Sequence, residues 1–211
     1  MIFIKLIFKT FKKKIIFASV LIILNEDYNR LIMNIVKVLD KEFTPYIPQE
    51  EIECEIRRVA REINRDMAGK DPLFLVMLNG AYMFACELFK TIENPCEILF
   101  VKYKTYAGTQ STYNANVIIG VEAEDIKGRD IVVVEDIIDS GFTMSQLNKD
   151  LENAGAASIH IATMLFKPNA FKYNYKIDYV GLNIDNEFIV GYGLDYNEYG
   201  RNLREIYKIV E

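Results

Sequence analysis

One stretch decides the fold, and it reads Ile131-Val132-Val133-Val134-Glu135-Asp136-Ile137-Ile138-Asp139-Ser140-Gly141-Phe142-Thr143. Its first four residues are an unbroken β-branched run, which is typical of a strand buried on both faces of a parallel sheet. Ser140, Gly141 and Thr143 then predict a tight turn and the N-terminus of a helix that ends near Asn153. In open α/β sheets ligands bind at such a carboxyl end, where the free N–H groups of a helix suit a phosphate. The stretch therefore predicts a site for a phosphorylated ligand, most simply a sugar phosphate.

Three carboxylates, Glu135, Asp136 and Asp139, crowd the exit of this predicted strand. A solvated acidic loop is the simpler interpretation for one or two such residues. Three of them within five positions repel one another, which is costly unless a cation or ligand hydroxyls offset the charge. We therefore interpret the cluster as part of the site.

Composition describes one globular domain with an acidic body. The chain has 211 residues, 51% of them hydrophobic and 26% charged, which is enough for a substantial core. Its net charge of -5 combines six Lys/Arg and two Asp/Glu in residues 1–32 with 19 basic and 28 acidic residues in the remainder. An acidic body without a basic stripe argues against a nucleic-acid partner.

Cysteine and histidine usage narrows the chemistry. Cys54, Cys86 and Cys96 have no metal-ligand spacing, which predicts reduced thiols in a cytoplasmic protein. His160 is the only histidine and lies in an apolar run, where a structural role in the core or at a sheet edge is expected. Catalytic triads built around any other histidine are thereby excluded. The chemistry must rest on carboxylates, lysines and backbone groups.

Residues 1–32 stand apart from the globular pattern. Five lysines precede the ten-residue apolar run Ile15–Leu24, as in a signal peptide, but no small-x-small cleavage site follows. The run is short for a membrane span, so membrane association is the weaker interpretation. We interpret residues 1–32 as an N-terminal extension, disordered or helical, or as codons upstream of a start at Met33. Residues 33–211 are expected to form a single domain.

The other elements repeat the strand-turn-helix plan. A helix is expected to open at Gln49 with one apolar stripe, formed by Ile52, Ile56, Val59, Ala60, Ile63 and Met67. A buried strand over 73–78 leads through Asn79-Gly80-Ala81 into a helix over 82–91. Further strands are predicted over 98–104, 117–121, 158–166, 179–184 and 188–192, a turn over 125–130, and a strand over 205–210 on a sheet edge. One α/β domain accounts for this pattern.

Residues 105–116 are polar and have no apolar periodicity. A hairpin loop and a mobile lid are both consistent with this composition.

The run from Val134 to Thr143 resembles the phosphoribosyl-pyrophosphate motif of type I phosphoribosyltransferases. Its form, Glu-Asp-x-x-Asp-[Ser/Thr]-Gly-x-Thr, is similar to that of the hypoxanthine(-guanine) phosphoribosyltransferases. Leu78-Asn79-Gly80-Ala81 resembles the first active-site loop of that family, and residues 190–201 resemble its C-terminal signature. With Thr105-Tyr106 in the lid and Lys167 after a strand, the resemblance covers nearly everything from Asn34 onward. It implies a twisted, mainly parallel sheet flanked by helices, with a small hood built from terminal segments.

For the sugar and phosphates, the resemblance implies that Glu135 and Asp136 hold the ribose hydroxyls, partly through Mg²⁺. Carboxylates suit this role because they only accept hydrogen bonds and they bind hard cations. The loop formed by Asp139, Ser140, Gly141, Phe142 and Thr143 would wrap the 5′-phosphate. Asn79 and Gly80, in a turn that this family often builds with a non-proline cis bond, would bind pyrophosphate with Arg201 as a clamp.

For the base, the resemblance implies that Lys167 donates a hydrogen bond to the exocyclic oxygen of a 6-oxopurine, which adenine lacks. Phe188 would stack on the base, the Ile189 backbone would read its edge, and Asp195 would carry a second Mg²⁺. Asp139 would also face the imidazole ring as general base or proton relay. A core Phe188, a solvated Lys167 and a turn residue at Asp195 are the simpler interpretations, and the shared register of the motifs outweighs them.

The implied activity is Mg²⁺-dependent transfer of a 5-phosphoribosyl group from phosphoribosyl pyrophosphate to N9 of hypoxanthine, and also of guanine, in cytoplasmic purine salvage. The family precedent is a homodimer or homotetramer. Two departures from the common pattern stand out: Asn79, where lysine is frequent, and Phe142, where many members carry a basic residue. The alternatives are a preference for xanthine and a non-catalytic regulator that senses the ligand on the same fold.

Overall fold

The computed structural model describes residues 34–104 and 117–210. The predicted N-terminal extension and the predicted lid, with Thr105 and Tyr106, lie outside the described residues.

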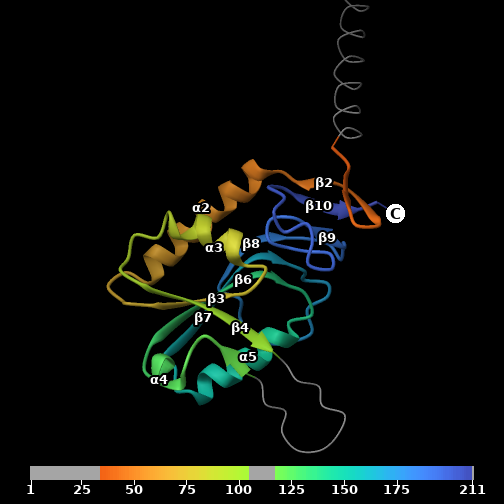
Figure 1. Cartoon of the computed structure of the whole chain (residues 1–211). Helices are drawn as coiled ribbons and strands as arrows, with labels where there is room; N and C mark the ends of the chain where they lie inside the picture. Colours follow the sequence, from red (N-terminus) through yellow and green to blue (C-terminus); the bar gives the residue numbers. More distant parts are fainter. Residues whose placement is uncertain (1–33, 105–116, 211) are drawn as a thin grey trace, which may run out of the picture.

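A six-stranded sheet forms the centre of the molecule, in the order β5-β4-β3-β6-β7-β8 (Figure 1). Five strands run parallel: β3 (Leu73–Met77), β4 (Glu97–Lys104), β6 (Asp130–Ile138), β7 (Ser158–Phe166) and β8 (Tyr179–Asn183). The short β5 (Val117–Ile119) pairs antiparallel with β4. The β-branched run at the start of β6 lies between β3 and β7, with Val133 opposite both Leu75 and Ile161. This confirms the prediction of a strand buried on both faces.

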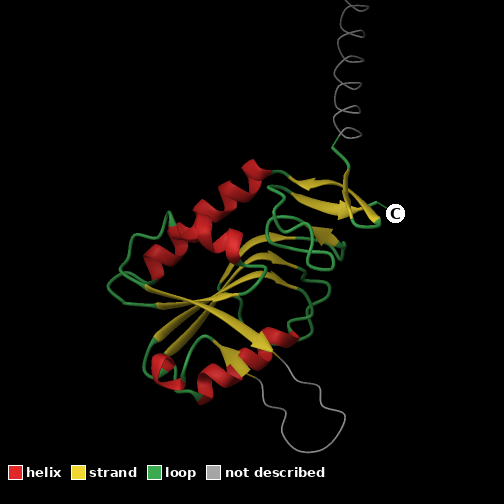
Figure 2. Ribbon diagram, in the orientation of Figure 1, coloured by secondary structure: helices red, strands yellow, loops and turns green. Residues whose placement is uncertain are grey.

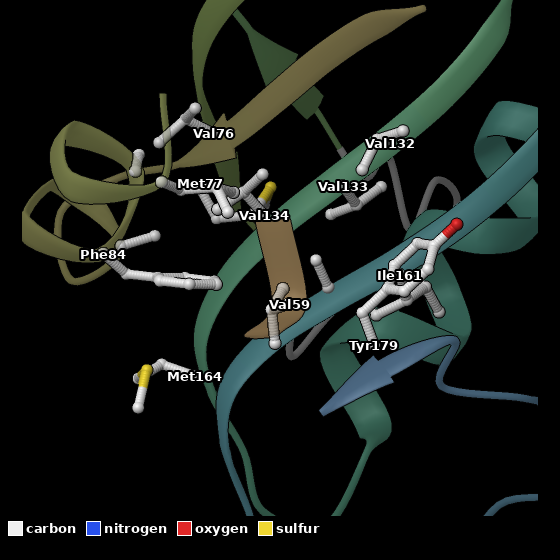
Figure 3. Packing of buried hydrophobic residues seen from close by; sticks show 14 of the residues in the cluster. Val59, Val76, Met77, Phe84, Val132, Val133, Val134, Ile161, Met164 and Tyr179 are labelled. Carbon is white, nitrogen blue, oxygen red and sulfur yellow. The ribbon is translucent and has the colours of Figure 1, made fainter. Parts of the chain in front are cut away.

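Helices cover both faces of the sheet (Figure 2). On one side lie α2 (Gln49–Asp66) and α3 (Tyr82–Phe89), and on the other lie α4 (Ala123–Ile126) and α5 (Phe142–Asn153). All six residues of the predicted α2 stripe are buried. Figure 3 shows Val59 of α2 and Phe84 of α3 packed over the β3 and β6 valines, which explains why these helices need a single apolar face.

A smaller antiparallel sheet has the order β1-β2-β10-β9. Together with residues 191–205, which connect β9 to β10, it forms the hood. Its strands come from both ends of the described chain: β1 (Val36–Val38), β2 (Lys41–Ile47), β9 (Ile189–Val190) and β10 (Ile206–Ile209). The prediction that residues 205–210 pair on an edge is wrong, because β10 lies between β2 and β9. The β1–β2 hairpin that covers it has short strands and contains Pro45, so it carries little strand signal.

Two further boundaries differ from expectation. The strand predicted over 188–192 ends at Val190, because Gly191 and Tyr192 take positive φ values of 98° and 50° and turn the chain. The turn predicted over 125–130 begins with α4, where Glu122 and Asp125 form a reciprocal capping box. In the part of the chain that the structure describes, no helix is long and apolar enough to span a membrane.

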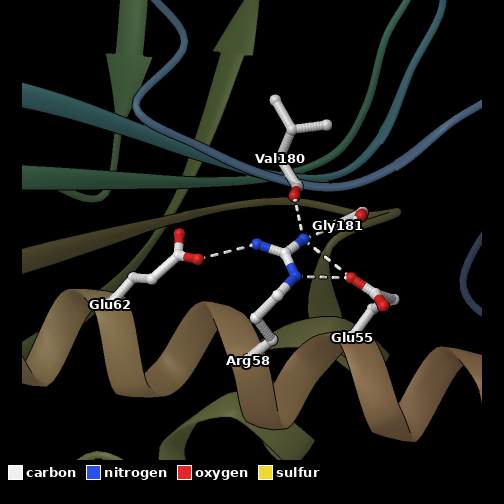
Figure 4. Close-up of polar contacts among 5 residues, drawn as sticks. All are labelled: Glu55, Arg58, Glu62, Val180 and Gly181. Atoms are coloured by element: carbon white, nitrogen blue, oxygen red, sulfur yellow. Dashed lines mark hydrogen bonds and ion pairs between the residues drawn. The ribbon is translucent and has the colours of Figure 1, made fainter.

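One arginine ties α2 to the free edge of the large sheet (Figure 4). The Arg58 guanidinium donates to the carbonyl oxygens of Val180 and Gly181 on β8, at 2.6 and 3.0 Å. Glu55 and Glu62, one turn away on either side, accept its other N–H groups at 2.7 and 2.9 Å. Arg58 thereby occupies backbone acceptors that an edge strand leaves open.

Candidate active site

Two adjacent carboxylates, Glu135 and Asp136, lie within β6 itself. The expectation that they follow the strand is therefore wrong, since pairing with β7 continues to Ile138. Burial, followed by the charge of Asp136, raises the pKa of Glu135 well above its ordinary value. Burial also raises the pKa of Asp136, and hydrogen bonds with Glu135 and the Ile137 N–H, followed by the charge of Arg201, partly oppose this rise. A carboxylate pair held at this cost of desolvation and repulsion is the arrangement expected of a binding site.

The next residues form a loop around a cavity of about 130 Å³, lined by Glu135 and by residues 137–144. Gly141 has φ +82°, a conformation that glycine adopts without strain, and it is the residue from which α5 starts. The N-cap residue Gly141 makes no side-chain cap, and the first N–H group of the helix, that of Phe142, donates to Ser140 Oγ of the loop at 3.4 Å. The structure thus brings Asp139, Ser140, Gly141, Phe142 and Thr143 together in an arrangement suited to an anion.

Lys167 lies at the end of β7, beside this loop. Its Nζ is 2.8 Å from Asp139 Oδ2, and its backbone N–H donates to the Ile138 carbonyl oxygen at 3.0 Å. The Lys167 side chain is 11% exposed and that of Asp139 is 54% exposed. A buried ammonium and an accessible carboxylate therefore sit side by side at the carboxyl ends of β6 and β7.

The first active-site loop and the hood converge on the same end of the sheet. The Leu78–Asn79 peptide bond is cis, as the resemblance implies. A Cβ atom on Gly80 would overlap the Asp136 carboxylate, and one on Gly193 would overlap the Gly80 carbonyl oxygen. Gly193 of the hood, Gly80 and Asp136 are therefore stacked in direct contact, which only glycine permits at the first two positions.

Arg201 is held by several hood residues. Its guanidinium is 2.7 Å from Asp195 Oδ1 and 2.8 Å from Glu198 Oε2, and it donates to the Gly193 carbonyl oxygen at 2.8 Å. The Tyr82 hydroxyl donates to the Arg201 carbonyl oxygen at 3.1 Å. An open pocket lies between the first loop and the hood, and it is lined by Leu78, Asn79, Tyr82 and residues 198–202, which include Arg201. Asn79 and Arg201 thus share one pocket, as expected for two residues that bind the same group.

Phe188 and Ile189 belong to the hood. The Phe188 ring packs edge-on against Tyr196, with centroids 5.9 Å apart, and is tilted 6.2 Å from Phe43. The ring is nevertheless 45% exposed, whereas Ile189 is buried. Phe188 therefore has an exposed aromatic face, and its ring is held in place by Phe43 and Tyr196.

Sequence reasoning missed three residues that take part in this arrangement. They are Tyr82, which binds the Arg201 carbonyl, Glu198, which binds its guanidinium, and Tyr175, whose hydroxyl donates to the Gly141 carbonyl oxygen at 3.0 Å. Tyr82 directly follows the first loop and Glu198 lies within the C-terminal signature, so proximity in sequence was an available signal. The signal for Tyr175 is the alternation of apolar and polar side chains over residues 171–177.

The fold and the arrangement of this site indicate a transferase that forms nucleotides. A family model described as the phosphoribosyl transferase domain matches residues 46–197. The chain belongs to the phosphoribosyltransferase family.

The names of similar proteins within that family state a narrower activity. The chain is 36% identical over 163 residues to a hypoxanthine-guanine phosphoribosyltransferase of Mycobacterium tuberculosis, covering 74% of this chain and 81% of the relative. It is 38% identical over 156 residues to the enzyme of that name from Streptococcus thermophilus, covering 74% and 86%. A crystal structure of a hypoxanthine phosphoribosyltransferase from Staphylococcus aureus superposes with a TM-score of 0.72 at 31% identity, over 79% of this chain and 90% of that one.

Proposed function

We propose that the protein transfers the 5-phosphoribosyl group of phosphoribosyl pyrophosphate to N9 of hypoxanthine or guanine, releasing pyrophosphate. The relatives carry names that state this reaction class. The observation that carries the proposal is the Lys167–Asp139 pair, 2.8 Å apart beside the phosphate loop.

The pair complements one edge of a 6-oxopurine. That edge presents the exocyclic oxygen, an acceptor, next to N7, which carries a proton in one neutral tautomer. Lys167 donates and the Asp139 carboxylate accepts, so the two side chains match the oxygen and the N7–H group in turn. Adenine places an amino donor where the oxygen would be, opposite the lysine, and is rejected because both donors are left unpaired. Asp139 then takes up the imidazole proton as N9 attacks.

The sugar phosphate binds along β6 and the loop that follows. Glu135 and Asp136 accept hydrogen bonds from the ribose hydroxyls, and the N–H groups from Ser140 to Thr143 bind the 5′-phosphate at the start of α5. The anomeric carbon becomes oxocarbenium-like as pyrophosphate departs, in common with other glycosyl transfers. Holding both ends of the sugar keeps that carbon in line with the base.

Pyrophosphate binds between the first loop and the hood. Arg201 exchanges its contacts with Asp195 and Glu198 for phosphate oxygens, which suit its planar fork. Asn79 and the Gly80 backbone bind the opposite side. Asn79 has no charge, so Arg201 supplies the positive side chain in this pocket.

Mg²⁺ fits the residues present. Mg²⁺ usually binds through one or two carboxylates together with substrate phosphates and water, rather than in an all-protein cage. Glu135 and Asp136 are such a pair, and their raised pKa values show two carboxylates that a cation would stabilise. Within the described ranges, no three His, Cys, Asp or Glu side chains gather as a metal cage. Asp195 is proposed as a ligand on the pyrophosphate side. When bound, Mg²⁺ neutralises the charge that develops on pyrophosphate.

The remaining assignments rest on the family resemblance. Phe188 stacks on the base, and the Ile189 backbone reads its edge. Thr105 and Tyr106 belong to a loop that closes over the site, and the protein assembles as a homodimer or homotetramer. We propose a cytoplasmic location, supported by three cysteines without disulfide bonds.

The test is a base-specificity assay. Wild-type protein, phosphoribosyl pyrophosphate and Mg²⁺ are mixed in turn with hypoxanthine, guanine, xanthine, adenine and uracil, and nucleotide is quantified. We expect product from hypoxanthine and guanine. Product from xanthine alone would support the alternative substrate, and no product from any base would support a ligand-sensing regulator.

Two variants then test the roles. Lys167→Ala is expected to lose the preference for 6-oxopurines over adenine, and the donor role is refuted if the preference persists. Asp139→Asn is expected to lower kcat by at least about 100-fold, the lower end for general base catalysis. Unchanged turnover with hypoxanthine would refute its proton-transfer role.

A further inference from the structure

The segment that follows Lys167 folds back onto the phosphate loop. It begins with a turn, in which the N–H groups of Ala170 and Phe171 donate to the Lys167 carbonyl oxygen at 3.1 and 3.2 Å. The Lys172 N–H then donates to the Ser140 carbonyl oxygen at 3.1 Å. The phosphate loop is therefore bound from outside by a segment to which the sequence assigned no role.

Two aromatic rings of this segment pack against Gly141. A Cβ atom at Gly141 would overlap the Phe171 ring and would lie 2.8 Å from the Tyr175 hydroxyl oxygen. The Phe171 and Tyr175 rings meet edge-to-face with centroids 5.0 Å apart, and Phe171 meets Phe166 of β7 in the same way at 5.2 Å. The rings are thus fixed to β7 and leave room at Gly141 only for a residue without a side chain.

The Tyr175 hydroxyl adds a directional contact. It donates to the Gly141 carbonyl oxygen at 3.0 Å, the same oxygen that accepts the Ser145 N–H at the start of α5. Burial raises the pKa of Tyr175, and the nearby Glu135 charge raises it further, so the hydroxyl remains a neutral donor. One oxygen therefore receives two hydrogen bonds, from α5 and from Tyr175, and its peptide plane is held between them.

We propose that Tyr175 is a positioning residue for the 5′-phosphate of the substrate. The peptide plane that it holds joins Gly141 to Phe142, so the hydroxyl fixes the direction of the Phe142 N–H, which donates to Ser140 Oγ of the phosphate loop at 3.4 Å. Tyr175 touches no reacting atom and acts through Gly141. The proposal rests on the proposed function only in taking the loop of residues 139–143 as the 5′-phosphate site.

The test compares Tyr175→Phe with Tyr173→Phe. Tyr173 is the matched control because its ring neighbours both Tyr175 and Phe142, at 6.4 Å each. Tyr175→Phe keeps the ring and removes one hydrogen bond, so KM for phosphoribosyl pyrophosphate should rise about 5- to 10-fold. The KM for the base should stay near the wild-type value in both variants. The melting temperature of Tyr173→Phe should also stay near that of the wild type.

A binding measurement separates this inference from the proposed reaction. Isothermal titration of ribose 5-phosphate and of ribose into each protein isolates the contribution of the phosphate. We expect the affinity for ribose 5-phosphate to fall in Tyr175→Phe by the same factor by which its KM for phosphoribosyl pyrophosphate rises. In Tyr173→Phe the affinity for ribose 5-phosphate should equal that of the wild type. Equal affinities in wild type and Tyr175→Phe, equal losses in both variants, or a wild type that binds no ribose 5-phosphate would overturn the inference. Absence of turnover in a wild type that does bind it would overturn only the proposed reaction.

Discussion

Arg58→Met should destabilise the protein although Arg58 lies outside the active site. The substitution keeps most of the aliphatic stem and removes the donors to the Val180 and Gly181 carbonyl oxygens, at 2.6 and 3.0 Å. It also leaves Glu55 and Glu62 without their shared partner.

The magnitude follows from these contacts. A hydrogen bond to a charged group contributes about 1.5–3 kcal/mol to stability where it is buried. The Arg58 side chain is 36% exposed, so water replaces part of the loss, and the free energy of unfolding should fall by about 2 kcal/mol in total. In a domain of this size, that corresponds to a decrease in Tm of about 4–8 °C.

The assay is urea unfolding followed by circular dichroism, with Arg57→Met as the matched control. Arg57 directly precedes Arg58 in the same helix, is 54% exposed, and has Glu53 as its ion-pair partner at 3.7 Å. Its replacement should change the free energy of unfolding by less than about 0.5 kcal/mol. Arg58→Lys should recover less than half of the loss, since an ammonium cannot match the fork. The reasoning is refuted if Arg58→Met is no more destabilising than Arg57→Met.

Two further predictions concern the site. Gly193→Ala should lower kcat/KM by about 100-fold, because its Cβ would displace the Gly80 backbone. The control is Gly69→Ala, which also has a positive φ but would place its Cβ where nothing lies within 4 Å. Comparable losses of kcat/KM in both variants would contradict the steric account. Glu135→Gln should stabilise the ligand-free protein, since burial and Asp136 raise the pKa of Glu135 and the folded state holds its proton more tightly than the unfolded chain does. The wild type then loses stability as pH rises above about 5, so the gain in Tm should be larger at pH 8 than at pH 5, and a gain independent of pH would refute this linkage.

The parts of the fold that could be predicted are those set by local pattern. The β-branched run of β6 and the apolar stripe of α2 are strong periodic signals, and both are confirmed. The hood could not be derived in this way. Its strands are two to seven residues long, and β10 takes its place only by pairing with β2 from the other end of the chain. That pairing is specified by long-range contacts rather than by periodicity.

The site divides along the same line. Glu135 to Thr143 are contiguous, so their grouping at one end of the sheet could be predicted from one stretch, apart from the expectation that Glu135 and Asp136 lie beyond the strand. The pairing of Lys167 with Asp139 depends on β7 lying next to β6, and the resemblance supplied the role of Lys167 where periodicity did not. Tyr82 was missed because its contact with the Arg201 carbonyl oxygen depends on how the hood meets the first loop. The contact between Glu198 and Arg201 is local, and its spacing of three residues within the C-terminal signature was the available signal.

Two sets of contacts to main-chain groups hold these pieces together, one at the phosphate loop and one at the first loop. At the phosphate loop, Lys172 and Tyr175 bind the carbonyl groups of Ser140 and Gly141. At the first loop, Gly193 rests on Gly80. The groups proposed to bind the 5′-phosphate and pyrophosphate are thus positioned by different segments of the chain, residues 172–175 and Gly193. Substitutions in one segment should therefore alter affinity at its own phosphate group first. This independence is what allows a Tyr175 variant to be distinguished from a Gly193 variant by ligand.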